Sequence, residues 1–214
     1  MRQYFNLITL CVLVAFPALS AAAQVAEVVD GDTIRVGEVT YRIEGIDAPE
    51  HGQKCGTWSC GNDATTAMSK LVQGKRVECV GESLDDYGRV LARCHVDGAD
   101  FGATLISAGL AWAFTKYSDT YVDEENEARQ RGVGIWSGSF QTPWGYRAER
   151  WEVEAQVAPD GCPIKGNISS NGKIYHPPWS PWYSRTKISV EKGERWFCSE
   201  AEAVRAGWRA PLWR

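Results

Sequence analysis

The sequence predicts an α+β chain that is mainly β: a small β-barrel carrying helices, followed by a small disulfide-stapled module. Five short strand-like segments precede residue 97, and segments of helical period lie between and after them. Six cysteines remain once the first 23 residues are set aside. The 214 residues suffice for one domain with an appendage or for two small domains. The chain is 44% apolar and 23% charged, which excludes general disorder and low-complexity sequence.

The strands are predicted from the alternation of apolar and polar residues. Residues 39–43 alternate with period two and place Arg42 on the polar face. Val36-Gly37-Glu38-Val39 is typical of a tight hairpin, and Asp30-Gly31-Asp32 is typical of a turn between two strands. We therefore expect strands over 25–29, 33–36, 39–43, 77–80 and 90–96.

Helices are predicted from apolar spacing and from capping residues. Apolar residues at 64, 67, 68, 71 and 72 lie on one helix face, which Asn62 or Asp63 would cap and Gly74 would end. Asp100 would cap a second helix that runs to about residue 108 and ends at Gly109. We expect further helices over 122–131 and, with Ser199 as cap and Gly207 as stop, over 199–206.

The first 23 residues have the layout of a secretory signal peptide. Arg2 gives a positive start, residues 7–18 form an apolar run, and small residues occupy 20–23. The run is short for a membrane span, so cleavage is favoured over an uncleaved anchor. Lipid attachment at Cys11 is a further alternative. We expect the mature protein to be secreted or periplasmic, without stable membrane insertion.

The remaining six cysteines are an even number, which is typical of disulfides in an exported chain. Of the many possible pairings, the sequence favours the local one: Cys55–Cys60, Cys79–Cys94 and Cys162–Cys198. In the second pair both side chains share the apolar face of their strands, so this bond would join two core strands. Buried free thiols are the alternative. For the last pair, zinc with His176 is another, although a fourth ligand is lacking.

Charge and tryptophan content divide the chain into parts. Residues 24–150 carry 13 basic and 20 acidic side chains, whereas residues 161–214 carry 9 basic and 4 acidic ones. Seven of the ten tryptophans lie from Trp144 onward. We expect a barrel domain at 24–150, a linker at 151–160 and a small basic module at 161–214. Interleaved basic and aromatic residues in this module would suit nucleic-acid docking. The favoured alternative is that the tryptophans form the core of a small module that a disulfide stabilises.

Four fragments stand out: Asp30-Gly31-Asp32-Thr33, the segment 42–50, Asp86-Tyr87-Gly88-Arg89 and Gly134-Ile135-Trp136. The first three carry carboxylates and arginines. Carboxylates on loops suit a hard cation such as Ca²⁺, and arginines suit phosphate oxygens. Together they can attack and stabilise a phosphodiester. Each fragment alone also fits a turn or a strand end, so the signal lies in their order and spacing. His51 is interpreted as a loop residue and His95 as an outward strand residue, without catalytic roles.

With these fragments and Gly109-Leu110-Ala111, residues from about 24 to 136 resemble the thermonucleases, the staphylococcal nuclease family. The resemblance implies an OB-fold five-stranded barrel with about three helices. It also implies Ca²⁺-dependent cleavage of DNA and RNA, without sugar specificity, to 3′-phosphate products. The implied Ca²⁺ ligands are Asp32, Asp47 and the backbone carbonyl of Ala48. Glu50 is the implied general base, Arg42 and Arg89 the phosphate-binding arginines, and Tyr87 and Tyr117 candidates for substrate contact.

Two departures from the family pattern bear on the site. The family's best-known member has threonine where this chain has Ala48; the carbonyl survives that change, but the hydroxyl is lost. Asp85-Asp86 stands where a basic side chain would help to hold phosphate. The rival interpretation is a noncatalytic nucleic-acid-binding module. We favour the enzyme because the five site residues are all retained: Asp32, Arg42, Asp47, Glu50 and Arg89. We also expect a monomer.

Overall fold

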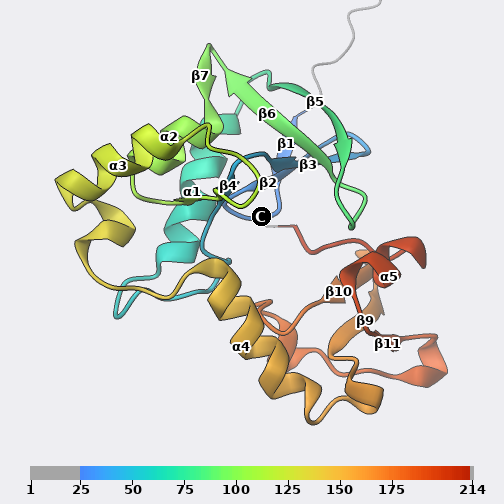
Figure 1. Ribbon diagram of the computed structural model, residues 1–214. Coiled ribbons are helices and arrows are strands. Elements are labelled where there is room, and N and C mark those ends of the chain that lie inside the picture. Colours follow the sequence, from blue (N-terminus) through green and yellow to red (C-terminus); the bar gives the residue numbers. More distant parts are fainter. Residues whose placement is uncertain (1–24, 213–214) are drawn as a thin grey trace, which may run out of the picture.

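A computed structural model of the protein describes residues 25–212. The predicted signal peptide at 1–23 lies outside these residues. Figure 1 shows a blue-to-yellow part, which contains a β-barrel, and a smaller orange-to-red part beside it. Helix α4 (Pro143–Ala155) runs from the first part to the second.

The barrel is built on a six-stranded sheet. Its strands are β1 (Ala26–Val28), β2 (Thr33–Val36), β3 (Val39–Ile43), β5 (Glu78–Leu84), β6 (Val90–Val96) and β7 (Ala99–Asp100). They lie in the order β1-β2-β3-β6-β5, with β7 beside β6, and only β3 and β6 run parallel. Two short strands, β4 (Ile46–Asp47) and β8 (Trp112–Ala113), pair separately. This mixed, mainly β arrangement is the predicted OB-fold type, and β5 extends beyond its predicted end through a register shift after Val80.

Three helices cover the barrel: α1 (Cys60–Val72), α2 (Phe101–Ser107) and α3 (Val122–Arg131). Asp100 caps α2 as predicted, because its side chain accepts a hydrogen bond from the Ala103 N–H at 2.9 Å. The predicted cap of α1 at Asn62 or Asp63 is wrong, since the helix begins at Cys60. Its first turn is fixed to the preceding loop by the Cys55–Cys60 disulfide and by a hydrogen bond from the Gly61 N–H to the Gln53 carbonyl (3.1 Å).

Two of the sequence motifs meet in a close backbone contact. Gly109 follows α2 with a φ of 65°, and Gly134 opens a 3-10 turn, η1 (Gly134–Ser137), with a φ of 56°. A Cβ atom on Gly109 would lie 2.3 Å from the Val133 carbonyl oxygen. The Ile135 N–H donates to the Gly109 carbonyl at 2.9 Å. Both glycines are therefore needed to seat the end of α3 and η1 against the end of α2.

The barrel core lies between the sheet and the first two helices. Its fully buried members include Ile34 and Ile43 from the sheet, Met68 from α1, and Phe101 and Leu105 from α2. A satellite cluster under the short disulfide loop contains Cys55, Cys60, Trp112 and Ile135, with Trp58, Trp136 and Phe140 packed against it. The cysteine-bridged loop is thus anchored on aromatic residues from the end of the barrel part.

The second part is a small module with its own core. It contains β9 (Ile164–Ser169), β10 (Gly172–His176), β11 (Arg195–Phe197) and α5 (Glu200–Arg205), and its sheet has the order β10-β9-β11. Ser199 caps α5 as predicted, accepting from the Glu202 N–H at 3.1 Å. The buried core is Ile164, Tyr175, Phe197, Ala203 and Trp208.

Helix α4 connects the two parts and was not predicted. Thr142 caps it and Pro143 occupies its first turn, which is a recognised start signal. Residue 150, the predicted end of the barrel domain, lies inside this helix. The segment predicted as a linker, 151–160, begins with the last turn of α4 and ends in a 3-10 turn at Pro159–Gly161. Trp151 of α4 packs against the module core, so the helix belongs structurally to the module as well.

Three disulfides join Cys55 to Cys60, Cys79 to Cys94 and Cys162 to Cys198, the pairing favoured from the sequence. The zinc alternative is wrong, because both of its thiols are consumed by the third bond. His176 instead lies 3.2 Å from the Ser180 hydroxyl and 3.2 Å from the Asn167 side chain. Three disulfides indicate an oxidising, extracellular or periplasmic environment. Residues 25–212 contain no helix with the length and apolar character that crossing a membrane requires.

Candidate active site

Arg42 of β3 joins the two carboxylates that the resemblance marks as metal ligands. Its Nη1 atom lies 3.0 Å from Asp32 Oδ2, and its Nη2 atom lies 3.0 Å from Asp47 Oδ1. Asp32 directly precedes β2, Arg42 lies near the end of β3, and Asp47 ends β4, so the ends of three strands meet at this place. Asp47 is fully buried and Asp32 nearly so, which makes these ion pairs internal rather than solvent-screened.

The loops that carry these carboxylates are packed tightly on α1. A Cβ atom on Gly31 would lie 2.8 Å from the Ala48 Cβ and 2.9 Å from the Ala64 Cβ, so only glycine fits there. The Ala48 N–H donates to Asp32 Oδ2 at 2.9 Å, and the Thr33 hydroxyl donates to Asp32 Oδ1 at 2.9 Å. Asp32 is therefore held from two sides, with Ala48 directly beside it.

Glu50 lies on a loop that is clamped by Gln53, a residue the sequence analysis did not single out. Gln53 is fully buried, its Oε1 atom accepts from the Glu50 N–H at 3.1 Å, and its own N–H donates to the Glu50 carbonyl at 2.7 Å. Gly61 closes the other side, because a Cβ atom there would lie 1.8 Å from the Glu50 carbonyl oxygen. The position of Glu50 thus depends on the start of α1.

Arg89 is oriented by the loop between β5 and β6. Its Nε atom donates to Asp85 Oδ2 at 2.7 Å, and its backbone N–H donates to Asp85 Oδ1 at 2.9 Å. Its Nη1 atom reaches the Thr33 hydroxyl at 3.4 Å. Asp85 therefore holds this arginine in place. From the sequence alone, its charge was expected to be unfavourable near phosphate.

Arg147 of α4 enters the same site and was missed from the sequence. Its Nη1 atom lies 2.6 Å from Glu50 Oε1 and 3.1 Å from Asp47 Oδ1, and its Nη2 atom lies 2.8 Å from Asp47 Oδ2. Asp47 Oδ1 is thus shared by Arg147 and Arg42, while Asp47 Oδ2 contacts Arg147. The contact spans 100 residues of sequence, and no local pattern around Arg147 marks it.

Burial and the crowding of charges shift the carboxyl pKa values in opposite directions. For Asp32, burial is outweighed by Arg42 and by hydrogen bonds, so its pKa is lowered. For Asp30, burial and the neighbouring Asp32 and Glu50 raise the pKa well above its ordinary value. Burial also raises the pKa of Glu50 to about 7; Arg147 opposes this rise, and Asp32 and Asp47 add to it. Burial is therefore the leading cause of both raised values, and neighbouring carboxylates add to it.

These groups line a hollow of about 660 Å³, which we call the carboxylate hollow. From the barrel it is lined by Asp30, Asp32, Arg42, Glu50, Tyr87, Arg89, Phe114 and Tyr117. Its other wall comes from α4 and the module, through Arg147, Trp151, Trp179 and Glu200. The module thus lies directly over the residues that the sequence motifs marked.

The aromatic candidates have different environments. Tyr117 is 70% exposed and Tyr87 37% exposed, and both line the carboxylate hollow. Trp112 is buried against Trp136, with ring centroids 5.9 Å apart, and does not line the hollow.

Neither histidine of the barrel part lines the carboxylate hollow. His51 is buried, with Nδ1 3.3 Å from the Thr65 hydroxyl, and its ring stacks on that of Trp182. His95 is half-exposed on its strand, and its Nε2 atom lies 3.3 Å from Asp100. The interpretation of both histidines as noncatalytic stays a prediction.

Comparison with known proteins assigns a family to each part of the chain. Residues 40–138 match the family described as staphylococcal nuclease homologue, and residues 143–210 match a family named ArfC. An "Uncharacterized endonuclease" of Escherichia coli is 36% identical over 157 residues, which cover 69% of this chain and 98% of that protein. The chain therefore belongs to the staphylococcal nuclease family.

Other relatives match a smaller share of the chain. A "Micrococcal nuclease" of Shigella flexneri is 32% identical over 58% of this chain and 79% of its own length. The "Staphylococcal-like nuclease CAN1" of Arabidopsis thaliana is 31% identical over 51% of this chain and 33% of its own length. The ArfC match begins at the first residue of α4, seven residues before the domain end predicted from the sequence.

Proposed function

We propose that the mature protein is an exported, Ca²⁺-dependent nuclease that cuts DNA and RNA without sugar specificity and leaves 3′-phosphate ends. The coarser assignment, a nuclease of the hydrolase class, rests on membership of the staphylococcal nuclease family and on relatives named endonuclease and micrococcal nuclease. For this chain, the carrying observation is that Asp32, Arg42, Glu50 and Arg89 line one hollow, with the buried Asp47 paired to Arg42.

The residues present fit a hard divalent cation. Asp32, Asp47 and the backbone carbonyl of Ala48 would hold Ca²⁺, which when bound supplies positive charge to the phosphate and to an attacking water. Arg147 already places a positive charge on the Asp47 carboxylate, in the position of a stand-in cation. Among residues 25–212 no three acidic, histidine or cysteine side chains form a metal cage, so carbonyl and water ligands would complete the coordination.

The protein's own groups would divide the chemical work. Glu50 would accept the proton of the attacking water, a task that suits a carboxyl whose pKa lies at about 7, although a bound cation would lower that value. Arg42 and Arg89 would hold the phosphoryl oxygens and stabilise the charge that develops there. Asp85 and Gln53 would act as positioning residues, because they hold Arg89 and the Glu50 loop.

The proposal is tested by digestion with protein that begins near Gln24. Plasmid, single-stranded DNA and RNA are offered in Ca²⁺, in Mg²⁺ and in EGTA. We expect cutting in Ca²⁺ only, and new 5′-hydroxyl ends that a polynucleotide kinase labels without prior phosphatase treatment. Arg89→Ala should lower kcat by roughly 10²–10³-fold, the usual cost of one donor to a developing oxyanion.

Arg35→Ala is the matched control for this experiment. Arg35 lies on β2 and pairs with Glu27, outside the carboxylate hollow, so its removal deletes an arginine from the barrel without touching the site. It should leave kcat within a factor of about two. If the folded wild-type protein cuts no substrate with either metal ion, the result favours the noncatalytic nucleic-acid-binding interpretation. If the protein cuts equally well in EGTA, Ca²⁺ is not required for the reaction.

A further inference from the structure

A second hollow, of about 470 Å³, lies between the barrel and the module, and we call it the junction cleft. We propose that the junction cleft binds an unpaired nucleotide of a single-stranded nucleic acid, next to the phosphodiester held in the carboxylate hollow. The inference rests on the proposed function and adds to it a substrate class and a role for the module.

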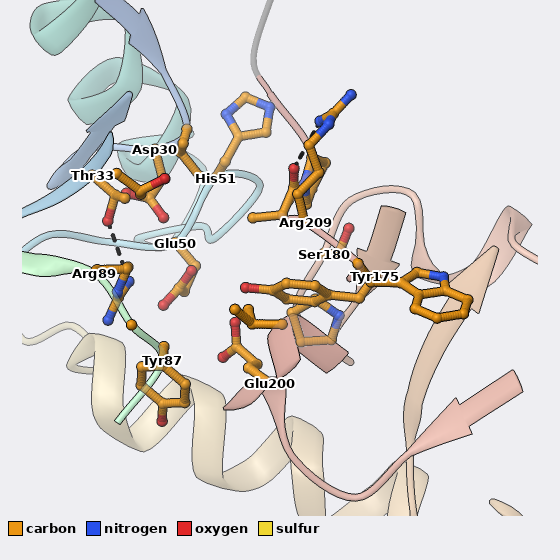
Figure 2. A pocket seen from close by; sticks show the side chains of 18 of the residues that line it. Asp30, Thr33, Glu50, His51, Tyr87, Arg89, Tyr175, Ser180, Glu200 and Arg209 are labelled. Atoms are coloured by element: carbon orange, nitrogen blue, oxygen red, sulfur yellow. Dashed lines mark hydrogen bonds between the residues drawn. The ribbon is translucent and has the colours of Figure 1, made fainter. Parts of the chain in front are cut away.

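The junction cleft continues from the proposed reaction site. Asp30, Glu50, Tyr87 and Arg89 line both hollows, and so do Trp179 and Glu200 of the module. Figure 2 shows Glu50 and Arg89 on one side of the cleft, with Tyr175 and Glu200 reaching toward them from the other. A nucleic-acid chain whose phosphate contacts Arg89 therefore passes from one hollow into the other.

The module side of the cleft is aromatic. Trp179 and Trp182, from the loop after β10, line it together with the buried rings of Tyr175 and Trp208. Trp179 is half-buried and packs against Trp151, with ring centroids 6.4 Å apart, so its ring is held while part of it faces the cleft. Aromatic rings beside a phosphate site are the usual stacking platforms for unpaired bases.

The opposite wall comes from the barrel and makes the space narrow. Val29, Thr33, Val39 and Thr40 face the module across the cleft. A volume of about 470 Å³ is that of an ordinary small-molecule cleft and not of a groove that accepts a double helix. In a duplex the bases are paired and stacked on one another, so only an unpaired or extruded base can stack in such a space.

The charges of the cleft favour contact with bases over contact with many phosphates. Arg89 and Arg209 line it, but so do the acidic residues Asp30, Glu38, Glu50 and Glu200. Tyr175 and Glu200 reach into the cleft from the same side, which places a polar pair there. With few phosphates neutralised, binding in the cleft should depend only weakly on salt, in contrast to a basic groove.

The test compares binding of a short oligothymidylate with binding of a blunt hairpin duplex by fluorescence anisotropy. It uses the full mature chain carrying Glu50→Gln, in Ca²⁺, so that the probe is not cut. Adding Trp179→Ala should weaken oligothymidylate binding by about fivefold or more, the usual loss of one base stack, and leave duplex binding unchanged. Trp179→Phe, which keeps a ring, should retain most of the affinity.

Trp196→Ala is the matched control, because Trp196 lies on β11 of the same module but does not line the cleft. Circular dichroism and the melting temperature check that each variant is folded. The inference would be overturned if folded Trp179→Ala bound oligothymidylate as tightly as its parent does. It would also be overturned if Trp179→Ala lost as much affinity for the duplex, or if Trp196→Ala lost as much affinity for oligothymidylate. If the protein binds as expected but the parent chain cuts nothing, the proposed function fails while the single-strand cleft stands.

Discussion

The barrel and the module contribute to the same site but were visible in the sequence to different degrees. The barrel supplies Asp32, Arg42, Asp47, Glu50 and Arg89 from motifs that stand close to turns and strand ends. The module side supplies Arg147, Trp179 and Glu200, and none of them lies in a recognisable motif. The barrel side of the site is marked by local sequence, whereas the opposite wall is assembled from distant contacts.

The two parts also differ in how they are stabilised. The barrel core contains eighteen buried residues, whereas the module core contains five and is closed by one disulfide. Small cores of this kind usually depend on such staples. The comparison therefore predicts that removing a disulfide from the module costs more than removing the short one from the barrel.

The largest expected effect is on the module. Replacing Cys162 and Cys198 together by alanine should lower its free energy of unfolding by about 4 kcal/mol, because the bond closes a long loop. Replacing Cys55 and Cys60 should cost the barrel about 2 kcal/mol, because its loop is short. Urea unfolding followed by tryptophan fluorescence measures both, since most tryptophans lie in α4 and beyond.

The two variants should also differ in the shape of the transition. Without Cys162–Cys198 we expect the module to unfold before the barrel, which gives two steps where the parent gives one. Equal losses of stability in the two double variants would show that the module is not the weaker part. That result would contradict the comparison.

The second effect is a pH dependence that belongs to the module. Burial, with Lys165 nearby, lowers the pKa of His176 from an unfolded value of about 6.5 to about 4. Between these values the unfolded chain binds a proton that the folded chain does not, so stability is lost as the pH falls from about 6.5 to 4. His176→Gln, which cannot titrate, should remove up to about 3 kcal/mol of this loss.

The measurement is urea unfolding of parent and His176→Gln at pH 7.5 and pH 4.5. The variant loses two buried hydrogen bonds and should be less stable at pH 7.5, but its stability should fall less on acidification. Burial also lowers the pKa of His51, which contributes in the same direction in both proteins and cancels in the difference. Parallel pH profiles would assign the acid sensitivity to other groups.

The barrel was predictable because its signals are local. Period-two alternation gave the strands, Asp100 gave the start of α2, and the resemblance of the motifs gave the OB-fold. The two-residue strands β4 and β8 were not predictable, since so short a segment becomes a strand only through its partner. Helix α4 could have been found from Thr142 and Pro143, which form a start signal that its irregular apolar pattern obscured.

The candidate site was predictable only in part, for the same reason. Asp32 and Asp47 stand in motifs, but Gln53 holds the Glu50 loop through hydrogen bonds that no sequence pattern encodes. Arg147 lies on a helix whose other arginine, Arg150, is exposed beside Tyr146. Nothing in the sequence distinguishes the two, because the choice depends on how α4 docks against the barrel.

The smallest expected effect is on Ca²⁺ affinity and concerns Arg147, through which α4 contacts the barrel. Arg147 pairs with Asp47 and Glu50, the carboxylates beside which Ca²⁺ would bind, so a cation must share or displace this guanidinium. Arg147→Ala should therefore tighten Ca²⁺ binding about tenfold, which corresponds to about 1.4 kcal/mol. Isothermal titration of the metal without nucleic acid measures this directly, independently of any activity.

Arg150→Ala is the control, because it removes a positive charge from the same helix without touching the carboxylates, and it should leave Ca²⁺ affinity unchanged. The metal-free Arg147→Ala protein should also melt earlier, since two buried carboxylates lose a partner, and Ca²⁺ should restore part of that loss. Weaker Ca²⁺ binding by Arg147→Ala would mean that the module's arginine builds the metal site rather than competing for it. The module would then be needed for the reaction itself and not only for choosing its substrate.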